Sequence, residues 1–370
     1  MRTLKDFNLK GKRVLVRCDF NVPLGEKGEM AKRASPSSLS SFPKEMKILD
    51  DFKIKVTIPT IEYLIEKGAK VILMSHLGRP EGKVVESLRL TPVQDKLMEY
   101  LDLSVTKAGD CVGKEIEDWI RQMKPGEILL LENVQFNPGE KENDPNFAKT
   151  LASYADIFIM EAFGQAHRDY ASITGVPKYL PSGAGFLLEK EVKVLSQIIE
   201  NPKRPLVVII GGSKVGDKAK VAEKFSEIGD WLLVGNLIAE EIKGKKMKIK
   251  NLEKIIFPIL NEKMLDLDEG TIENFKDKIL LAKTIFWAGP LGKIEEEKYQ
   301  KGTKEIAKAV IESGAFSVVG GGDTIEFLNK IGLLEKFNHV STGGGAMLEF
   351  LSGEKLPGIE TLKGKWKLKI

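Results

Sequence analysis

Two glycine-rich stretches in the second half of the chain each precede a short helical pattern. Gly320-Gly-Gly-Asp-Thr leads into one amphipathic run, and Gly343-Gly-Gly-Ala leads into another. A glycine turn that opens a helix suits phosphate, because its backbone N–H groups point outward and the helix dipole favours an anion. Neither stretch is a P-loop, since no Gly-Lys-Ser/Thr follows. One such turn is more often an ordinary connection, but several at strand ends indicate a phosphate-binding half.

Charged residues near these glycines could serve the same phosphate groups. Asp323, beside Thr324, could hold a Mg²⁺ ion that bridges phosphate oxygens, and it could at the same time cap the helix that follows. Lys214 and Lys218 are four residues apart at a strand-to-helix turn, so both can face one ligand and neutralise a migrating phosphoryl group. The alternative for the two lysines is a solvated surface pair.

The loops of the first half are basic instead of glycine-rich. A small acid that bears carboxylate and phosphate groups would suit a cleft lined by arginine and histidine. Asp19 and Asn21 could accept hydrogen bonds from a hydroxyl group of such a ligand. Each residue also has a structural interpretation, and for Arg17 pairing with a buried carboxylate is equally open. The basic residues of this cleft would be Arg17, His76, Arg79, His167 and Arg168.

Short apolar runs rich in β-formers alternate with helical patterns along the chain. This alternation is typical of an α/β fold, in which helices cover both faces of a parallel sheet. Open sheets of this class bind ligands beyond the carboxyl ends of their strands, where the glycine-rich and basic loops lie. The candidate strands are 13–16, 70–74, 128–131, 156–159, 206–210, 231–234, 254–257, 284–287 and 316–319. The candidate helices include 58–67, 92–101, 147–154 and 303–313.

The length of 370 residues favours two domains. Apolar residues recur at helical spacing after Gly185, and Asn201-Pro202 ends the run, which predicts one helix that connects the two halves. A crossover helix inside a single sheet is the local alternative. The predicted division is an acid-binding lobe at 1–182, a hinge helix at 183–201, a nucleotide-binding lobe at 202–350 and a segment at 351–370 that returns to the first lobe.

Two stretches do not fit the α/β pattern. Within residues 25–50, the stretch 31–43 is rich in Ser and Pro and has two basic residues. We expect a mobile surface loop tolerated as an insertion, and a phosphorylation or partner site is the alternative. The C-terminal Lys363-Gly-Lys-Trp-Lys-Leu-Lys-Ile could be a basic tail or a short docked strand.

Composition narrows the classes of protein further. The net charge of +4 is nearly balanced over the chain, which argues against a nucleic-acid partner. There is no apolar run long enough to span a bilayer and no apolar signal segment at the start, so we expect a cytoplasmic protein with no membrane partner. Cys18 and Cys111 have no pairing pattern and are expected to be reduced and buried.

Taken in order, the loop motifs resemble those of phosphoglycerate kinase over nearly the whole chain. The resemblance implies two Rossmann-like lobes, each a parallel sheet with helices on both faces, joined by the connecting helix in a monomer that closes by hinge bending. It implies reversible phosphoryl transfer between 1,3-bisphosphoglycerate and ADP, giving 3-phosphoglycerate and ATP in glycolysis, with Mg²⁺. The matching motifs are Arg17-Cys-Asp-Phe-Asn-Val-Pro, Ser75-His-Leu-Gly-Arg-Pro, Ala162-Phe-Gly-Gln-Ala-His-Arg, Gly211-Gly-Ser-Lys-Val, Gly320-Gly-Gly-Asp-Thr and Ser341-Thr-Gly-Gly-Gly-Ala.

The same resemblance assigns roles to individual residues. Lys53 and Lys214 would stabilise the transferring phosphoryl group, and Asp323 would serve the metal. The acid would be bound by Asp19, Phe20, Asn21, Lys53, His76, Leu77, Gly78, Arg79, Gln135, His167 and Arg168. The nucleotide would be bound by Gly212, Lys214, Lys218, Gly292, Glu295, Gly321, Gly322, Asp323 and Thr324.

The chain departs from the family pattern at several of these positions. Lys53 stands where the family has an arginine, so the charge is kept but the planar fork is lost. Gln135 replaces a second arginine and removes a positive charge from the acid's cleft. On the nucleotide side, Trp287-Ala-Gly-Pro and Val234-Gly-Asn-Leu-Ile-Ala replace a Trp-Asn-Gly-Pro and a glycine-rich strand end, and 250–274 is shorter than expected. Met160-Glu161 stands where the family has Asn-Asp.

Three functional hypotheses follow from the motifs and these departures. The first is a working phosphoglycerate kinase with a remodelled site. The second is a catalytically weakened or silent relative that binds a phosphorylated metabolite or a protein, which Lys53, Gln135 and Ala288 favour. The third is a kinase for another acidic metabolite, because a less charged substrate would need fewer arginines.

Overall fold

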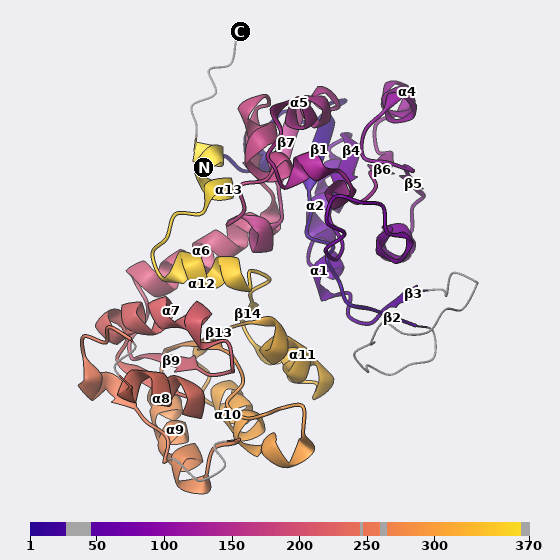
Figure 1. Ribbon diagram of the computed structural model, residues 1–370. Coiled ribbons are helices and arrows are strands. Elements are labelled where there is room, and N and C mark those ends of the chain that lie inside the picture. Colours follow the sequence, from indigo (N-terminus) through magenta and orange to yellow (C-terminus); the bar gives the residue numbers. More distant parts are fainter. Residues whose placement is uncertain (27–45, 245–246, 260–264, 364–370) are drawn as a thin grey trace. The chain divides into compact units, whose positions relative to one another are not determined.

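The computed structural model describes residues 1–26, 46–244, 247–259 and 265–363, in two compact units (Figure 1). The first unit comprises the described residues of Met1–Lys190 and those from Leu356 onward, and the second comprises those of Glu191–Lys355. Each unit has its own parallel sheet, to which helices pack. The predicted α/β class with two parallel sheets is therefore confirmed.

The first unit is built on one parallel sheet. Its strands are β1 (Arg13–Arg17), β4 (Lys70–Met74), β5 (Val105–Lys107), β6 (Ile128–Leu130), β7 (Ile157–Met160) and β8 (Ser182–Ala184). Their spatial order is β5-β6-β4-β1-β7-β8. β1 pairs with β4 on one side and with β7 on the other, so the direction in which the chain adds strands reverses between β1 and β7. A sheet of this kind leaves a crevice beyond the carboxyl ends of those two strands.

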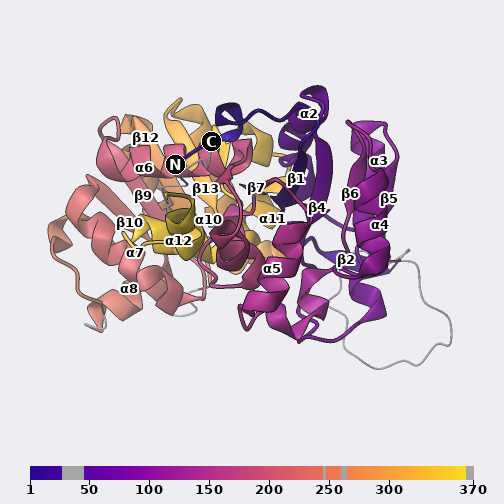
Figure 2. The same ribbon diagram turned by 90° about the horizontal axis from the view of Figure 1, so that it is seen from above.

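Helices cover both faces of the first sheet. The helices of this unit are α1 (Phe52–Lys55), α2 (Ile58–Glu66), α3 (Thr91–Leu101), α4 (Lys114–Gln122), α5 (Pro145–Ser153) and α13 (Pro357–Glu360). Figures 1 and 2 both show α2 and α5 on opposite sides of β1 and β4. In α2, Ile58, Ile61 and Leu64 recur at helical spacing and are buried against Val14 and Val71 of the sheet. This amphipathic pattern is what made α2 predictable from the sequence.

The second unit is also built on one parallel sheet, but the strand order differs from that of the first sheet. Its strands are β9 (Leu206–Ile210), β10 (Trp231–Val234), β11 (Ile255–Ile256), β12 (Thr284–Ala288), β13 (Phe316–Gly320) and β14 (His339–Val340). The order β11-β10-β9-β12-β13-β14 is that of a doubly wound nucleotide-binding sheet. The chain adds strands on one side of β9 and then on the other, from β12 onward. The ligand crevice of this sheet is therefore expected beyond the carboxyl ends of β9 and β12.

The helices of the second unit also pack on both faces of their sheet. They are α7 (Val215–Ile228), α8 (Asn236–Lys243), α9 (Glu269–Leu281), α10 (Lys301–Glu312), α11 (Gly322–Lys330) and α12 (Gly345–Leu351). Phe275 of α9 and Ile306 of α10 join Ile285 and Trp287 of β12 in one core cluster. Helix α7 contacts β9, β10 and α12, and α12 lies beside α7 in Figure 1. This arrangement holds the loops after β9 and β12 in place.

Helix α6 (Phe186–Glu200) contains the boundary between the two units. At its start, the backbone N–H groups of its first three residues donate to Thr60 Oγ1 and Glu161 at 3.1, 3.1 and 3.4 Å. These groups have no partner inside a helix, so the two side chains act as its cap. Further along, the buried Glu191 accepts hydrogen bonds from the Thr342 backbone and hydroxyl at 2.6 and 2.9 Å and contacts His339 Nε2 at 2.9 Å. The predicted helix is confirmed, but its predicted start at 183 is wrong, because residues 182–184 pair with β7 as strand β8. The first and later turns of α6 are each anchored within their own unit.

The buried Glu161 should make stability depend on pH. Burial raises the pKa of its carboxyl group from 4.5 to about 7, although the hydrogen bond from Thr60 opposes the rise. A pKa that is higher in the folded than in the unfolded protein stabilises the folded state. This stabilisation is complete at pH values below the unfolded-state pKa, and it is lost as the pH rises through the folded-state pKa. Between pH 5 and pH 8 we expect the free energy of unfolding to fall by about 2 to 3 kcal/mol more in the wild type than in Glu161→Gln.

Urea denaturation at both pH values would measure this difference. The matched control is Glu200→Gln, which changes an exposed glutamate at the other end of α6 and should keep the wild-type pH dependence. Equal pH dependence in the wild type and Glu161→Gln would show that Glu161 is ionised throughout this range.

Four further predictions concern the Ser- and Pro-rich stretch, the C-terminal segment, the two cysteines and membrane-spanning helices. β2 (Leu24–Glu26) and β3 (Met46–Ile48) pair antiparallel on either side of the Ser- and Pro-rich stretch, which lies outside the described residues, as does 364–370. The described C-terminal residues belong to the first unit, where the Gly358 N–H donates to the Ala166 carbonyl at 2.8 Å. Cys18 and Cys111 are unpaired and buried, as predicted. Among the described helices, none is both long and apolar enough to cross a membrane.

Candidate active site

An ion pair lies beyond the carboxyl end of β1, at the switch point of the first sheet. Asp19 is 5% exposed, and its Oδ2 accepts from Lys53 Nζ of α1 at 2.9 Å. Burial alone would raise the pKa of Asp19, but the positive charge of Lys53, with that of Arg17, lowers it below the ordinary value. Asp19 is therefore ionised at neutral pH, and it holds the Lys53 ammonium group beyond the carboxyl end of β1.

The loops after β1 and β4 are tied together by Asn21. Its Oδ1 accepts from the Gly78 backbone N–H at 2.8 Å, and Gly78 adopts the left-handed conformation with φ of 65°. The neighbouring Phe20 and Leu77 have side chains in the hydrophobic core, at 0% and 1% exposure. Among these predicted acid-binding residues, Phe20 and Leu77 can therefore reach a ligand only through their backbone groups.

His76 is a buried neutral histidine whose tautomer follows from its neighbour. Burial, followed by the charges of Arg17, Lys53 and Arg168, lowers its pKa to about 3. Nδ1 of His76 lies 3.4 Å from Nη2 of Arg17, and a guanidinium group can only donate a hydrogen bond. Nδ1 must then be the acceptor, so the proton is on Nε2. His76 can offer a ligand a neutral N–H donor at any physiological pH.

Arg17 is a structural residue and does not line the cleft, which settles the alternative that the sequence left open. Its side chain is completely buried. Nε donates to Ser172 Oγ at 2.7 Å, Nη1 donates to the Cys18 carbonyl, and Nη2 lies 3.9 Å from Glu140 Oε1. The expectation that Arg17 contacts the acid directly is wrong, because its donors serve the interior of the unit.

The remaining basic residues of the cleft differ in exposure. Arg79 and Arg168 are exposed, so their guanidinium groups are accessible to an anion. His167 is half-buried, and burial followed by the charge of Arg168 lowers its pKa to about 4. Its buried Nδ1 has no hydrogen-bond partner among the described residues. The first unit thus offers accessible cations beside neutral imidazole groups at the carboxyl ends of its strands.

Gln135 occupies a short turn of 3₁₀ helix, Val134–Phe136, which follows β6. The residue is 5% exposed, and the Gly82 N–H donates to its backbone carbonyl at 3.2 Å. Its buried Oε1 has no hydrogen-bond partner among the described residues. Gln135 contributes no charge, so cations elsewhere must carry the electrostatic recognition of an acid.

The second unit has a pocket of about 460 Å³ at the switch point of its sheet. This volume is in the range of sites that hold a small organic ligand. Loops after β9 and β12 contribute to it, as the strand order predicts. The lining residues are Gly212, Ser213, Gly235, Asn236, Leu237, Leu265, Pro290, Leu291, Gly292, Lys293, Glu295 and Asp323.

Glycines allow the loops after β9 and β12 to pack closely against each other beside this pocket. A Cβ atom on Gly211 would lie 2.2 Å from the Pro290 carbonyl oxygen, and one on Gly289 would lie 2.1 Å from that of Gly211. Nζ of Lys218, which is 9% exposed, lies against the same place, 2.8 Å from where a Cβ on Gly212 would be. The Lys218 ammonium group is thus held against glycine backbone next to the pocket, an arrangement that suits a phosphate group.

The start of α11 supplies the only acidic group of the predicted metal site. Gly321 is the N-cap of this helix with φ of 95°, and Asp323 lies in its first turn, so the expectation that Asp323 also caps α11 is wrong. Thr324 is buried, and its Oγ1 accepts from the Gly289 N–H at 3.0 Å. Asp323 lines the pocket with an exposed carboxylate. Among the described residues no cluster of three or more His, Cys, Asp or Glu could hold a metal, so any ion here would depend on ligand oxygens.

The structure brings together only part of the predicted nucleotide set. Gly212, Gly292, Glu295 and Asp323 line the pocket, whereas Lys214, Lys218, Gly321, Gly322 and Thr324 lie in the adjoining helix starts without lining it. Several lining residues were not predicted individually, among them Leu265 and Leu291. A leucine carries no chemical signal in the sequence, so only the fold could identify these walls.

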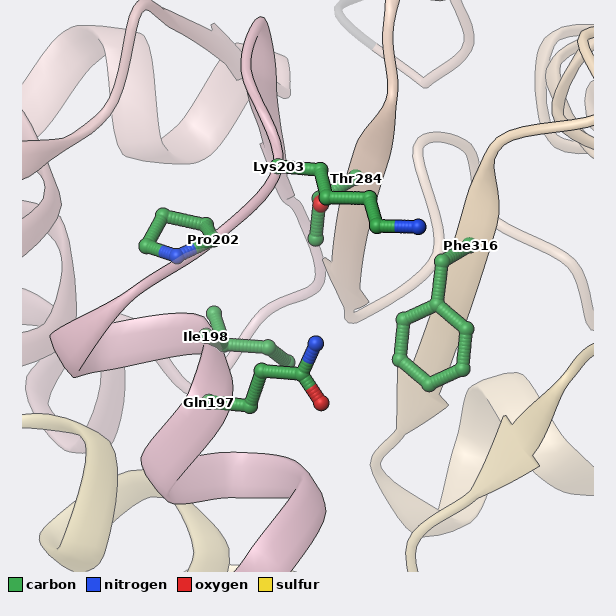
Figure 3. Close-up of a pocket in the computed structure, with 6 residues that line it drawn as sticks. All are labelled: Gln197, Ile198, Pro202, Lys203, Thr284 and Phe316. Carbon is green, nitrogen blue, oxygen red and sulfur yellow. The ribbon is translucent and has the colours of Figure 1, made fainter.

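A second pocket of the same unit, of about 80 Å³, is shown in Figure 3. It is lined by Gln197, Ile198, Pro202, Lys203, Thr284 and Phe316. Thr284 and Phe316 are the first residues of β12 and β13, so this pocket opens at their amino ends. It contains none of the predicted site residues, and ligands of open α/β sheets bind at the carboxyl ends. The larger pocket is therefore the candidate site of this unit.

Comparisons with known proteins identify a single family. A family model described as phosphoglycerate kinase matches residues 40–256 and 237–354. The phosphoglycerate kinase of Borrelia garinii subsp. bavariensis is 42% identical over 409 residues, covering 98% of this chain and 99% of the relative. That of Moorella thermoacetica is 41% identical over 408 residues, with coverage of 98% and 99%. Among solved structures, phosphoglycerate kinases from Coxiella burnetii and Pyrococcus horikoshii OT3 match with TM-scores of 0.78 and 0.82, at 34% and 30% identity, each pair covering 98% of both chains.

Proposed function

The chain belongs to the phosphoglycerate kinase family, and from this premise we propose how its residues carry out the family's reaction. The enzyme transfers a phosphoryl group reversibly between 1,3-bisphosphoglycerate and ADP, giving 3-phosphoglycerate and ATP in glycolysis. One observation supports the assignment of substrates: the switch points of the two sheets carry different chemical groups. Cations and neutral imidazoles lie at the first, and a glycine-lined pocket lies at the second.

The first unit would bind the phosphoglycerate. Arg79 and Arg168 are accessible and would pair with its carboxylate and phosphate groups, since a guanidinium group matches the geometry of both. His76 would donate from Nε2, and Asp19 would accept from the hydroxyl group while keeping Lys53 in place. Gln135, His167 and the backbone of the Phe20 and Leu77–Gly78 loops would complete the contacts.

The second unit would bind the nucleotide in its pocket. Lys218, held against Gly212 and Gly289, would neutralise phosphate charge, and the starts of α7 and α11 would present N–H groups to the phosphates. Gly292 and Glu295 line the same pocket and would contact the nucleoside. Gly321, Gly322 and Thr324 would shape the turn that places Asp323.

A magnesium ion fits the donors of this pocket. Asp323 offers one exposed carboxylate, and Mg²⁺ is commonly held by one or two carboxylates together with substrate phosphates and water. When bound, the ion would neutralise charge on the phosphate oxygens. The protein's own part is to hold Asp323 at the first turn of α11, where Thr324 ties that turn to the loop after β12.

Catalysis would rest on positioning and charge neutralisation, because the transferred phosphoryl group needs no proton abstraction by the protein. Lys214 would stabilise the migrating group from the nucleotide side and Lys53 from the acid side. We further propose a cytoplasmic monomer that acts by hinge bending and has no nucleic-acid or membrane partner. Small-molecule substrates are thus its only proposed ligands.

A coupled assay tests the proposed reaction. Purified protein is mixed with ATP, Mg²⁺ and 3-phosphoglycerate, and a dehydrogenase consumes the acyl phosphate product. Turnover that requires all three components is expected. If the protein binds 3-phosphoglycerate without turnover, it is a catalytically silent relative, the hypothesis that Lys53, Gln135 and Ala288 support. If it turns over only another acid, it is a kinase for a different substrate.

Restoring an arginine at Lys53 should raise activity. The ammonium group makes one contact with Asp19, at 2.9 Å, whereas a guanidinium group could keep that contact and also present a second N–H to the phosphoryl group. We expect Lys53→Arg to raise kcat/KM for 3-phosphoglycerate by about threefold to tenfold in the coupled assay. The control is Lys55→Arg on the same helix, which should leave the kinetics unchanged. No gain in Lys53→Arg would mean that other residues already compensate for the lost arginine.

A further inference from the structure

Asn236 is a buried polar residue in the wall of the nucleotide pocket. It is the first residue of α8, it is 5% exposed, and it lines the pocket beside Gly235 and Leu237. Asn236 has no part in the proposed phosphoryl transfer. An amide side chain in such a position needs partners for both its donor and its acceptor.

The orientation of the Asn236 amide is determined by one hydrogen bond. Its Nδ2 donates to the backbone carbonyl oxygen of Asp266 at 3.1 Å. A carbonyl oxygen can only accept, so the nitrogen must be on that side and Oδ1 on the other. Oδ1 is buried and has no hydrogen-bond partner among the described residues. A buried acceptor without a donor costs free energy, which a ligand's N–H or O–H group would recover.

The residues that line the pocket with Asn236 indicate which part of a ligand lies beside it. Leu237, Leu265 and Leu291 supply apolar walls, and Leu237 remains 41% exposed despite lining the pocket. Ser213, just before α7, and Asp323, the candidate metal ligand in the first turn of α11, lie instead at the helix starts that would face phosphate groups. Ionised phosphate oxygens are acceptors and cannot satisfy Oδ1. A flat ring with apolar faces and an N–H on its edge can do so.

We propose that Asn236 Oδ1 accepts a hydrogen bond from the exocyclic amino group of a purine base and thereby selects nucleotides that carry that group. The inference rests on the proposed nucleotide site of the second unit and adds a specificity-determining residue to it. Asn236 would contact only the edge of the base, so it would affect which nucleotide binds and would take no part in phosphoryl transfer.

The test compares nucleotides that differ only at the base. Calorimetry with Mg²⁺ gives Kd for ADP, for purine riboside diphosphate, in which hydrogen replaces the amino group, and for IDP, in which a carbonyl replaces it. The wild type should bind ADP about tenfold more tightly than either analogue. In Asn236→Ala this ratio should fall to about one, because no acceptor remains.

Leu237→Ala is the matched control in the neighbouring wall position. It removes apolar contact area, so it should weaken ADP and the analogues alike and keep the wild-type ratio. The wild-type comparison needs no variant, so the inference stays falsifiable even if Asn236→Ala does not fold. Equal affinity of the wild type for ADP and purine riboside diphosphate would overturn it, as would a ratio that survives in Asn236→Ala.

The remaining outcomes separate this inference from the function on which it rests. If 2′-deoxy-ADP loses the affinity and purine riboside diphosphate does not, Oδ1 meets the ribose and the assignment to the base is wrong. If no nucleotide binds to the wild type at millimolar concentration, the nucleotide site itself fails, and the inference fails with it.

Discussion

Replacing Lys214 with alanine is expected to lower kcat by about 10²- to 10³-fold, with little change in KM for 3-phosphoglycerate. Lys214 is the N-cap residue of α7 and is exposed directly after the loop that follows β9. An ammonium group there meets the charge that develops on the phosphoryl group during transfer. Losing a contact made mainly in the transition state lowers kcat and spares ground-state binding.

The coupled assay measures this effect, and Lys220→Ala is its matched control. Lys220 is on the same helix, is 70% exposed and pairs with Glu354 instead of the pocket. Its replacement should leave kcat near the wild-type value. If Lys214→Ala kept more than about a tenth of the wild-type kcat, Lys214 could not be a main source of transition-state stabilisation.

Replacing Arg17 with alanine is expected to destabilise the first unit by about 3 to 5 kcal/mol. The guanidinium group is fully buried, donates to Ser172 Oγ at 2.7 Å and lies 3.9 Å from the equally buried Glu140. Burial already raises the pKa of Glu140, and the charge of Arg17 opposes that rise. Without Arg17, Glu140 would be a buried carboxylate with no cation, and Nδ1 of His76 would lose its donor.

Urea denaturation at neutral pH measures the loss in Arg17→Ala. The control is Arg121→Ala, which removes a 65% exposed arginine from α4 and should change the free energy of unfolding by less than about 0.5 kcal/mol. Adding Glu140→Gln to Arg17→Ala should recover part of the stability, because the uncompensated charge is then gone. A loss below about 1 kcal/mol in Arg17→Ala would contradict the structural role of this residue.

Strands β1, β4, β9 and β12 were predictable from the sequence because each contains at least three consecutive apolar residues. β1, β4, β9 and β12 are buried on both faces, and Leu206–Ile210 contains no polar residue. β5, β8 and β14 were not predicted. Their sequences, Val-Thr-Lys, Ser-Gly-Ala and His-Val, have no such run, and they extend only because a neighbouring strand supplies a ladder.

The positions of the candidate-site loops were predictable from the sequence, but the directions of their side chains were not. The motif loops lie at the carboxyl ends of their strands, because strand and loop are adjacent in the sequence. Whether a side chain in such a loop faces the ligand is a separate matter. Arg17 and Asp19 are two residues apart, yet one serves Glu140 and Ser172 in the interior while the other holds Lys53 at the crevice.

The sequence by itself determined which functional side chains occur in each loop and the order of these loops along the chain. This was possible because a motif and the strand before it are local properties of the chain. It also determined the class of fold, through the alternation of apolar runs with helical patterns. Only the tertiary structure decided which of these groups lie together, because strand order, and not distance along the chain, brings the loops after β9 and β12 to one pocket. It also decided charge and hydrogen bonding: burial keeps His76 neutral and leaves Asn236 Oδ1 without a donor, and burial exists only after the chain has folded.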